Sequence, residues 1–169
     1  MIMKVKLDIP YPNIMVEKKN SYYADILSED YAGGVSELTA VMLYSYQHFL
    51  KFDTDWDFSK TIEEISIVEM LHMEMLGKII KFLGKEPVYS TCEASRGDCI
   101  MWNANNVNYT SDLRQMLKID INSEKQAIVN YKHHLNLIDD KHIKAVLSRI
   151  ILDEQHHLKI FETLLEQLC

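Results

Sequence analysis

Glu69 and His72 stand three positions apart in a run of residues whose apolar members recur every three or four positions, from Ile62 to Leu83. Such spacing predicts one face of a helix, and the two polar side chains occupy places where the pattern calls for apolar ones. A carboxylate and an imidazole at this spacing lie about one turn apart on the same side of a helix. Because burying them unpaired is costly, we expect other charged groups or metal ions to meet them in the interior.

The same Glu-x-x-His spacing returns at Glu154 and His157, again on the apolar stripe of a long predicted helix. Two further predicted helices each place one glutamate, Glu37 or Glu124, on their apolar face. Glu124 precedes the Asp139-Asp140 turn by about as many residues as the second motif follows it, so antiparallel helices bring these groups to one level. The other pair of helices shows the same arrangement.

These six side chains supply four carboxylates and two imidazoles to one interior. Buried carboxylates repel one another, and two divalent cations would neutralise the four charges. Oxygen and nitrogen ligands without thiolates suit manganese(II) or iron(II), and fit a closed tetrahedral zinc site poorly. The alternative is that each residue caps a helix, pairs with a neighbour or faces water. The predicted ligands of a two-metal centre are Glu37, Glu69, His72, Glu124, Glu154 and His157.

Several other polar residues lie on the same stripes. Tyr44 and Tyr131 each follow a predicted ligand by two turns, and we interpret them as core side chains, with a hydrogen bond to a ligand as the alternative. Asp120 is a candidate for orienting a ligand histidine, although a structural role is favoured. His48 is three turns from the ligand on its own helix, about 16 Å, which is too far. The remaining histidines are expected at the surface: His133, His134, His142 and His156.

Four long helices must position the predicted ligands. The first runs at least from Ser36, a possible N-cap, to Lys51. The second begins at Ser59 or Thr61 and ends near Gly84, a plausible residue just beyond a helix C-terminus. The third opens at residues 111–112, and the fourth follows the tight turn at residues 139–140.

The other segments show no long helical period. Residues 85–110 are aperiodic, and a connection of this length is unusual in a compact domain unless it crosses the length of a bundle. Residues 1–20 are predicted to form an extended N-terminal arm, and residues 21–30 a short helix. We therefore predict an all-α, up-down four-helix bundle with a long crossover between its second and third long helices, as one domain over residues 21–169.

The composition excludes several classes of protein. The chain has 169 residues, nearly half of them apolar, which is enough for one domain with a sizeable core. Its net charge of −7 argues against nucleic acid and against an anionic membrane as partners. No signal peptide and no apolar stretch of roughly 18 residues is present, so we expect a cytoplasmic protein. The three cysteines, Cys92, Cys99 and Cys169, form no C-x-x-C pair and are interpreted as free thiols in a reducing compartment, with redox thiols in the crossover as the less favoured alternative.

These motifs resemble the ferritin-like superfamily over nearly the whole chain after residue 20. Within it, GGVSEL at residues 33–38 and IEEISIVEMLH at residues 62–72 look most like manganese catalases and related spore-coat proteins. The resemblance implies that Glu69 bridges two metals and that Glu37 and His72 hold one of them. It assigns the other metal to Glu124 and His157. Glu154 is implied to lie nearby, where it either binds a metal or contacts one of the ligands.

The chain departs from each related group. Rubrerythrins, the next resemblance, carry rubredoxin cysteine pairs and a further carboxylate where Ala127 stands. Storage ferritins lack the second full Glu-x-x-His motif. Manganese catalases are longer and have a C-terminal extension.

The resemblance predicts a dinuclear manganese or iron protein that disproportionates hydrogen peroxide, with Glu154, if free of metal, as proton acceptor and donor. A di-iron ferroxidase or peroxidase of rubrerythrin type, acting with dioxygen or peroxide, is one alternative. A non-catalytic metal-binding coat or structural protein is the other. Because ferritin-like bundles usually associate, we also expect a homo-oligomer.

Overall fold

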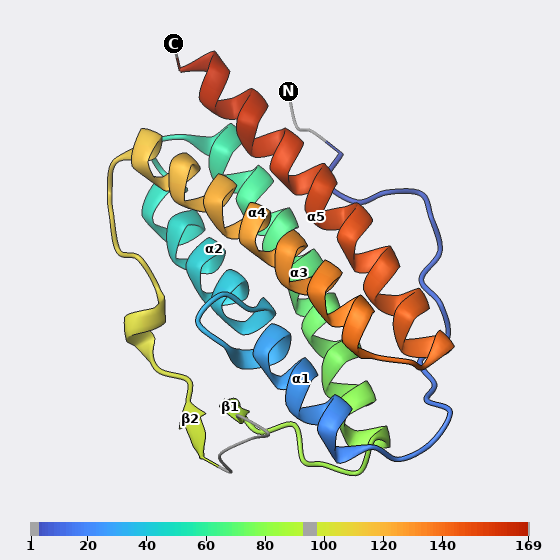
Figure 1. Cartoon of the computed structure of the whole chain (residues 1–169). Helices are drawn as coiled ribbons and strands as arrows, with labels where there is room; N and C mark the ends of the chain where they lie inside the picture. The colour runs from blue at the N-terminus through green and yellow to red at the C-terminus, as the bar shows by residue number, and fades with distance from the viewer. Residues whose placement is uncertain (1–3, 93–97, 169) are drawn as a thin grey trace.

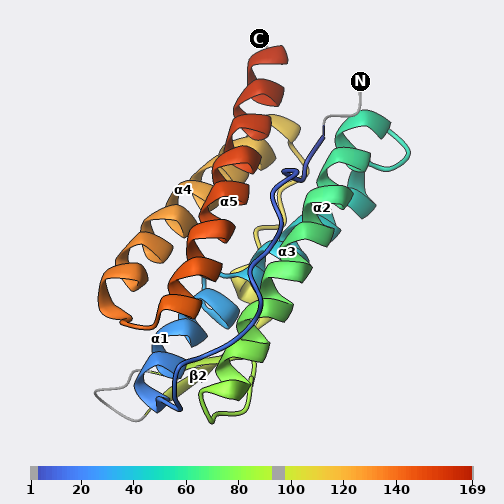
Figure 2. The same ribbon diagram turned by 90° about the vertical axis from the view of Figure 1, so that its right-hand side faces the viewer.

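The computed structural model describes residues 4–92 and 98–168. Figures 1 and 2 show long helices packed side by side, α2 antiparallel to α3 and α4 antiparallel to α5. The four helices of the bundle are α2 (Glu37–Lys51), α3 (Trp56–Phe82), α4 (Leu113–Leu137) and α5 (Lys141–Gln167). The prediction of an all-α four-helix bundle with a long crossover between the second and third long helices is confirmed.

Each helix of the bundle begins after a short polar side chain that accepts a backbone N–H. Ser36 caps α2 and Asp112 caps α4, as the sequence predicted. Helix α3 begins earlier than expected, because Asp55 accepts a hydrogen bond from the backbone N–H of Phe58 and supplies the cap. Gly84 follows the last turn of α3 with a φ of 101°, a left-handed conformation that favours glycine.

The crossover between α3 and α4 contains more structure than its sequence predicted. Strands β1 (Ser90–Cys92) and β2 (Cys99–Met101) form an antiparallel pair, and a 3₁₀ turn, η1 (Ala104–Asn106), follows. Strands of three residues are too short to give a recognisable period. The Trp102 indole N–H donates to the hydroxyl of Thr39, 2.9 Å away, and so ties the crossover to α2.

The prediction of free thiols is wrong for two of the three cysteines. Cys92 and Cys99 face each other in the strand pair and form a disulfide, with their Cα atoms 4.2 Å apart. No local pattern indicates this pairing, because the two strands that bring the cysteines together are too short to be predicted. Cys169 lies outside the described residues.

The N-terminal segment and the short helix α1 (Ser21–Ala32) cover parts of the bundle. Helix α1 begins after Asn20, whose side chain accepts from the backbone N–H of Tyr23, and extends two residues beyond the predicted end. Residues 4–20 contain no helix or strand and run along the bundle between α3 and α5, as the dark blue trace in Figure 2 shows. We call residues 4–20 the N-terminal segment below.

Two apolar clusters fill the interior on either side of the polar residues predicted to bind metal. On α3, Ile62 and Ile65 belong to one cluster, whereas Leu76 and Ile79 belong to the other. Glu69 and His72 lie between the two clusters along α3. Glu154 and His157 lie at the same level on α5. The buried polar groups therefore have apolar layers above and below them, which exclude water from both sides.

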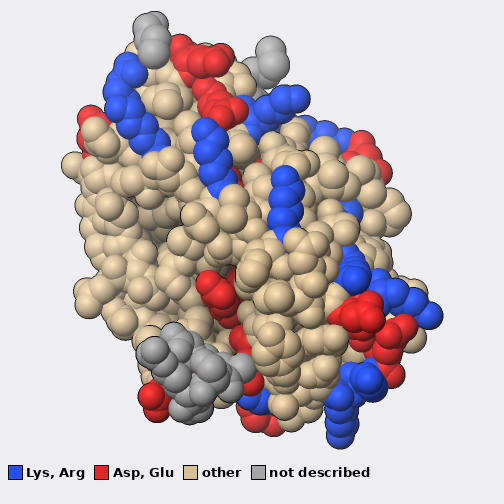
Figure 3. Space-filling model, viewed as in Figure 1, with Lys and Arg blue, Asp and Glu red and all other residues tan. Residues whose placement is uncertain are grey.

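The face of the molecule that Figure 3 shows carries charges of both signs. Figure 3 shows acidic and basic side chains intermingled on one face, with few charges over α2 and the crossover. Within the described residues, no helix combines the length and the apolar character that crossing a membrane requires.

Candidate metal centre

The six predicted ligands meet in the middle of the bundle. All six are buried, and none is more than 4% exposed. Their ligand atoms form two overlapping groups, in each of which one atom per residue lies within 4.8 Å of all the others. Glu69 and Glu154 belong to both groups. The first group also contains Glu37 and His72, and the second also contains Glu124 and His157.

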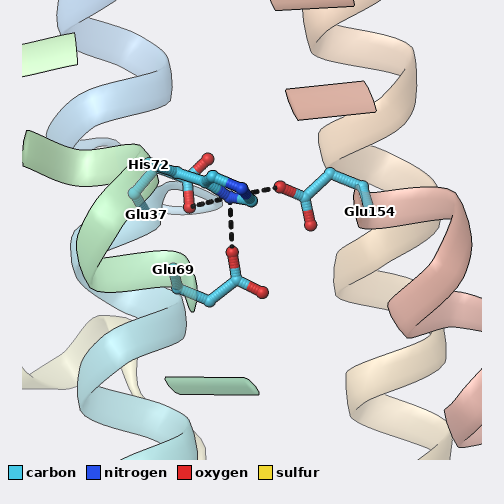
Figure 4. A group of neighbouring side chains, drawn as sticks. All are labelled: Glu37, Glu69, His72 and Glu154. Atoms are coloured by element: carbon cyan, nitrogen blue, oxygen red, sulfur yellow. Dashed lines mark hydrogen bonds and ion pairs between the residues drawn. The ribbon is translucent and has the colours of Figure 1, made fainter. Parts of the chain in front are cut away.

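The first group surrounds the Nδ1 atom of His72, as Figure 4 shows. This nitrogen lies 2.9 Å from Oε2 of Glu69, 3.0 Å from Oε1 of Glu154 and 3.7 Å from Oε2 of Glu37. The residues come from three helices: Glu37 opens α2, the motif of Glu69 and His72 lies mid-way along α3, and Glu154 comes from α5. We call this group the His72 side of the centre.

The second group surrounds the Nδ1 atom of His157. This nitrogen lies 2.8 Å from Oε1 of Glu69 and 3.5 Å from Oε2 of Glu154. Glu124 completes the group from α4. The two oxygens of Glu69 therefore face different histidines, and so do those of Glu154. We call this group the His157 side.

The crowded charges shift the pKa values of most groups in the centre. Burial, together with the charge of Glu154, raises the pKa of Glu37 and of Glu124 well above the usual range. Burial alone would lower the pKa of both histidines, but nearby carboxylates raise it well above the usual value, to about 10 for His157. Burial would raise the pKa of Glu154, yet the charge of His72 and hydrogen bonds from the neighbouring groups hold it below its usual range.

The donor set fits two divalent cations. Oε1 of Glu69, Oε1 of Glu154 and both ring nitrogens of His157 have no hydrogen-bond partner among the described residues. Oε1 of Glu69 nevertheless lies 2.8 Å from Nδ1 of His157, and Oε1 of Glu154 lies 3.0 Å from Nδ1 of His72, so candidate ligand atoms from different helices converge. Uncompensated buried polar atoms are costly, and cations bound by the carboxylate oxygens and by the Nδ1 atoms of the histidines would compensate the atoms that face the cluster. Two divalent ions also match the four negative charges.

Two buried tyrosines hold the outer glutamates, one on each side. The hydroxyl of Tyr131 donates to Oε1 of Glu37, and that of Tyr44 donates to Oε1 of Glu124 at 2.5 Å. Both rings are also part of the apolar core. The interpretation as core side chains is therefore correct but incomplete, because each tyrosine fixes one oxygen of a candidate ligand.

Sequence reasoning missed the carboxylate that orients His72. Nε2 of His72 lies 3.1 Å from Oδ2 of Asp153, which is fully buried on α5. Burial would raise the pKa of Asp153, but hydrogen bonds from His72, Arg149 and Tyr11 lower it to about 2. A signal was present: Asp153 follows Arg149 by four positions, a spacing that places an acidic and a basic side chain one turn apart on the same side of a helix.

Two polar residues have contacts that differ from those predicted from the sequence. Asp120, the candidate for orienting a histidine, instead accepts a hydrogen bond from the side chain of Gln47 at 2.7 Å. His134 is buried rather than at the surface, and its Nδ1 lies 2.7 Å from Oδ2 of Asp30 on α1. The prediction for His134 is wrong because α1 covers this histidine, and the sequence of so short a helix does not show which part of the bundle it packs against.

A small cavity reaches the centre from the side of α2 and α4. It has a volume of about 160 Å³. It is lined by the four glutamates of the centre, by small or apolar side chains such as Ala40 and Ala127, and by the exposed Asn108 of the crossover. A water molecule in liquid occupies about 30 Å³, so the cavity admits only a few molecules of that size. The arrangement thus combines six candidate ligands with access for a small molecule.

Comparison with known proteins places the chain in a family. Residues 35–169 match the family model described as the ferritin-like domain. The chain belongs to the ferritin-like family. A protein of Clostridium acetobutylicum named "Probable manganese catalase" is 26% identical to this ferritin-like chain over 170 residues, which cover 91% of the chain and 75% of the relative.

Solved structures share the same ferritin-like fold. KatB, a manganese catalase from Anabaena, is 24% identical and superposes with a TM-score of 0.84 over 98% of this chain and 81% of KatB. The bacterioferritin BfrA of Mycobacterium tuberculosis is 21% identical, with a TM-score of 0.72 over 89% of this chain and 88% of its own. At such identities the similarity shows the fold alone. The resemblance to ferritin-like proteins, and among them to manganese catalases, is confirmed.

Proposed function

We propose that this ferritin-like protein binds two manganese or iron ions and acts on hydrogen peroxide. The observation that carries the proposal is the pair of overlapping ligand groups, which share Glu69 and Glu154. On this proposal Glu69 bridges the two metals, and Glu37 and His72 hold one of them. Glu124 and His157 hold the other. A relative that is named "Probable manganese catalase" supports manganese as the metal and hydrogen peroxide as the substrate.

The reaction proposed is the conversion of two hydrogen peroxide molecules into two water molecules and one dioxygen molecule. A pair of such metal ions, when bound, supplies two-electron redox chemistry at adjacent positions. The protein supplies the rest. The cavity admits a small substrate, and Tyr44 and Tyr131 keep two ligand carboxylates in fixed orientations. Glu154, whose oxygens face both histidines of the centre, is available, if free of metal, to accept a proton from peroxide and return it to the leaving oxygen.

The test is to load the protein with manganese or iron and to follow dioxygen release from hydrogen peroxide with an oxygen electrode. We expect steady release with two metals per chain. Protein that holds two metals but leaves peroxide untouched would reject the catalase proposal. Glu154→Gln separates two roles of this residue: if it transfers protons, turnover falls by about 10²- to 10⁴-fold with both metals retained. If it is instead a ligand, metal is lost. Glu162→Gln, at an exposed position on the same helix, is the matched control.

Di-iron ferroxidase chemistry is a second candidate. Bacterioferritins share the fold, and one of the similar structures, that of the Desulfovibrio desulfuricans protein, is described as having a diiron site. Both alternatives use the same ligands, so the choice is made by reaction: oxygen consumption on addition of iron(II), without dioxygen release from peroxide, would favour the ferroxidase. Full metal content with neither reaction would favour the structural alternative. The homo-oligomer, the cytoplasmic location and the domain limits stay predictions.

A further inference from the structure

The N-terminal segment is anchored to α5 next to the His72 side of the centre. Arg149 of α5 donates from Nε and Nη2 to the carbonyl oxygen of Ile9, at 3.0 and 2.9 Å. Its guanidinium also lies over the ring of Tyr11, 4.3 Å from the ring centre. Arg149 is itself buried, so these contacts are made away from water, where they are strongest.

Tyr11 reaches from this segment into the network that orients His72. Its hydroxyl donates to Oδ2 of Asp153 at 2.5 Å, and the same oxygen lies 3.1 Å from Nε2 of His72. The other oxygen of Asp153 lies 2.7 Å from Nη1 of Arg149. Asp153 is thus held at both oxygens. Nε2 of His72 therefore faces Asp153, and Nδ1 faces the cluster as a candidate ligand.

The His157 side lacks such a support. Nε2 of His157 has no hydrogen-bond partner within residues 4–92 and 98–168. The two halves of the centre are therefore built differently, although each has one histidine, one outer glutamate and one tyrosine. One half is tied through Asp153 to a segment near the start of the chain, and the other is not.

We propose that Tyr11 is a positioning residue and that docking of the N-terminal segment fastens the His72 side of the metal centre. The inference rests on the proposed two-metal centre and adds to it an inequality between the two metals. Undocking of the segment removes the Tyr11 hydroxyl from Asp153 and frees His72 to rotate, so the metal on that side is released more easily. The metal on the His157 side is held independently of the segment.

The coupling acts in both directions. If a docked segment strengthens metal binding on the His72 side, then metal bound on that side stabilises the docked segment by the same factor. We therefore expect trypsin to cleave after Lys6 more slowly in the metal-loaded protein than in the metal-free protein. Equal cleavage rates in the two forms would contradict the proposal.

The decisive experiment compares Tyr11→Phe with Tyr31→Phe in the full chain. Tyr31→Phe removes another largely buried tyrosine hydroxyl, one that donates to the Pro87 carbonyl away from the centre. Each protein is loaded with manganese(II) and titrated with a competing chelator, and the two dissociation steps are measured separately. We expect Tyr11→Phe to weaken one metal by about ten-fold, the low end of the effect of residues that orient a ligand. The other metal should stay within about two-fold of the wild type.

Electron paramagnetic resonance adds a reading that a purely structural role would not change. At a chelator concentration that leaves the wild type fully loaded, Tyr11→Phe should show the signal of isolated manganese(II) in place of that of a coupled pair. Asp153→Asn, which keeps the shape of the side chain but removes its charge, should weaken the same metal at least as much. Circular dichroism and the melting temperature of the metal-free variants exclude misfolding as the cause.

The outcomes separate the inference from the proposed function. Wild-type protein that binds two metals, combined with a Tyr11→Phe variant that binds both as tightly or loses both equally, rejects the inference alone. Two metals without reaction with peroxide, combined with selective loss in Tyr11→Phe, rejects the proposed activity and supports the inference. Wild-type protein that binds no metal pair rejects both.

Discussion

Replacement of Glu69 by glutamine tests the bridging assignment, because it removes a charge from the cluster while keeping the shape of the side chain. Oε2 of Glu69 faces His72 at 2.9 Å and Oε1 faces His157 at 2.8 Å. A single substitution therefore acts on both sides. Glu37→Gln is the matched comparison, since Glu37 belongs to the His72 side alone.

The expected size of the effect follows from the number of metals each carboxylate touches. Residues that only orient a ligand change metal affinity by about 10- to 100-fold. Loss of a direct ligand should exceed that range, so we expect more than about 100-fold, or ~2.7 kcal/mol, per metal touched. Glu69→Gln should thus weaken both metals by this amount, and Glu37→Gln only one.

Metal content after dialysis against a graded chelator, measured by inductively coupled plasma mass spectrometry, distinguishes the two variants. Under conditions that leave two metals on the wild type, Glu69→Gln should retain none and Glu37→Gln about one. The metal-free melting temperature is the control for folding.

The same loss of metal in both variants would refute the reasoning, because the two carboxylates would then be equivalent.

Three further predictions concern the surroundings of the centre. Tyr44→Phe loses the hydrogen bond to its glutamate and should weaken metal binding on the side that this glutamate serves by about ten-fold, measured by chelator competition; an equal effect on both sides would argue against the pairing. Burial raises the pKa of Asp30 to about 6, and hydrogen bonding and charge from Asp30 raise that of His134 although burial alone would lower it. Because the pKa of each group is higher in the folded than in the unfolded protein, the free energy of unfolding falls as pH rises. For Asp30 the fall occurs between about pH 4 and 6. For His134 it begins near pH 6.5, the pKa of the unfolded state, and continues through the higher pKa of the folded state. Chemical denaturation between pH 5 and 8 should therefore show a smaller loss in Asp30→Asn/His134→Gln than in the wild type. The double substitution Cys92→Ser/Cys99→Ser removes the disulfide, whose cysteines have a sequence separation of 7, and should lower the free energy of unfolding by about 2 kcal/mol. A reductant should lower the free energy of unfolding of the wild type by the same amount and leave that of the variant unchanged. Metal content should be the same in both proteins.

The bundle was predictable because its signals are long and repeated. Helices of about 25 residues show many turns of the same apolar pattern, and polar residues in that pattern, such as Glu69 and Glu154, stand out. The turn at residues 139–140 then fixed the relative level of two helices. Convergence of the six side chains followed from these positions without knowledge of any contact.

The parts that were missed depend on contacts between segments distant in the sequence. Tyr11 and Asp153 are separated by 142 positions, and Asp30 and His134 by 104. No local pattern reports such pairs, and the N-terminal segment has no period that would indicate where it docks. The disulfide was missed for a related reason, since its two short strands could not be recognised.

A crystal structure of the manganese-loaded protein, with anomalous diffraction at the manganese edge, tests the central claim most directly. We expect two anomalous peaks between the four long helices, one beside Glu37 and His72 and the other beside Glu124 and His157, with Glu69 in contact with both. Peaks elsewhere, or a single peak at full loading, would contradict the assignment of a two-metal centre to these residues.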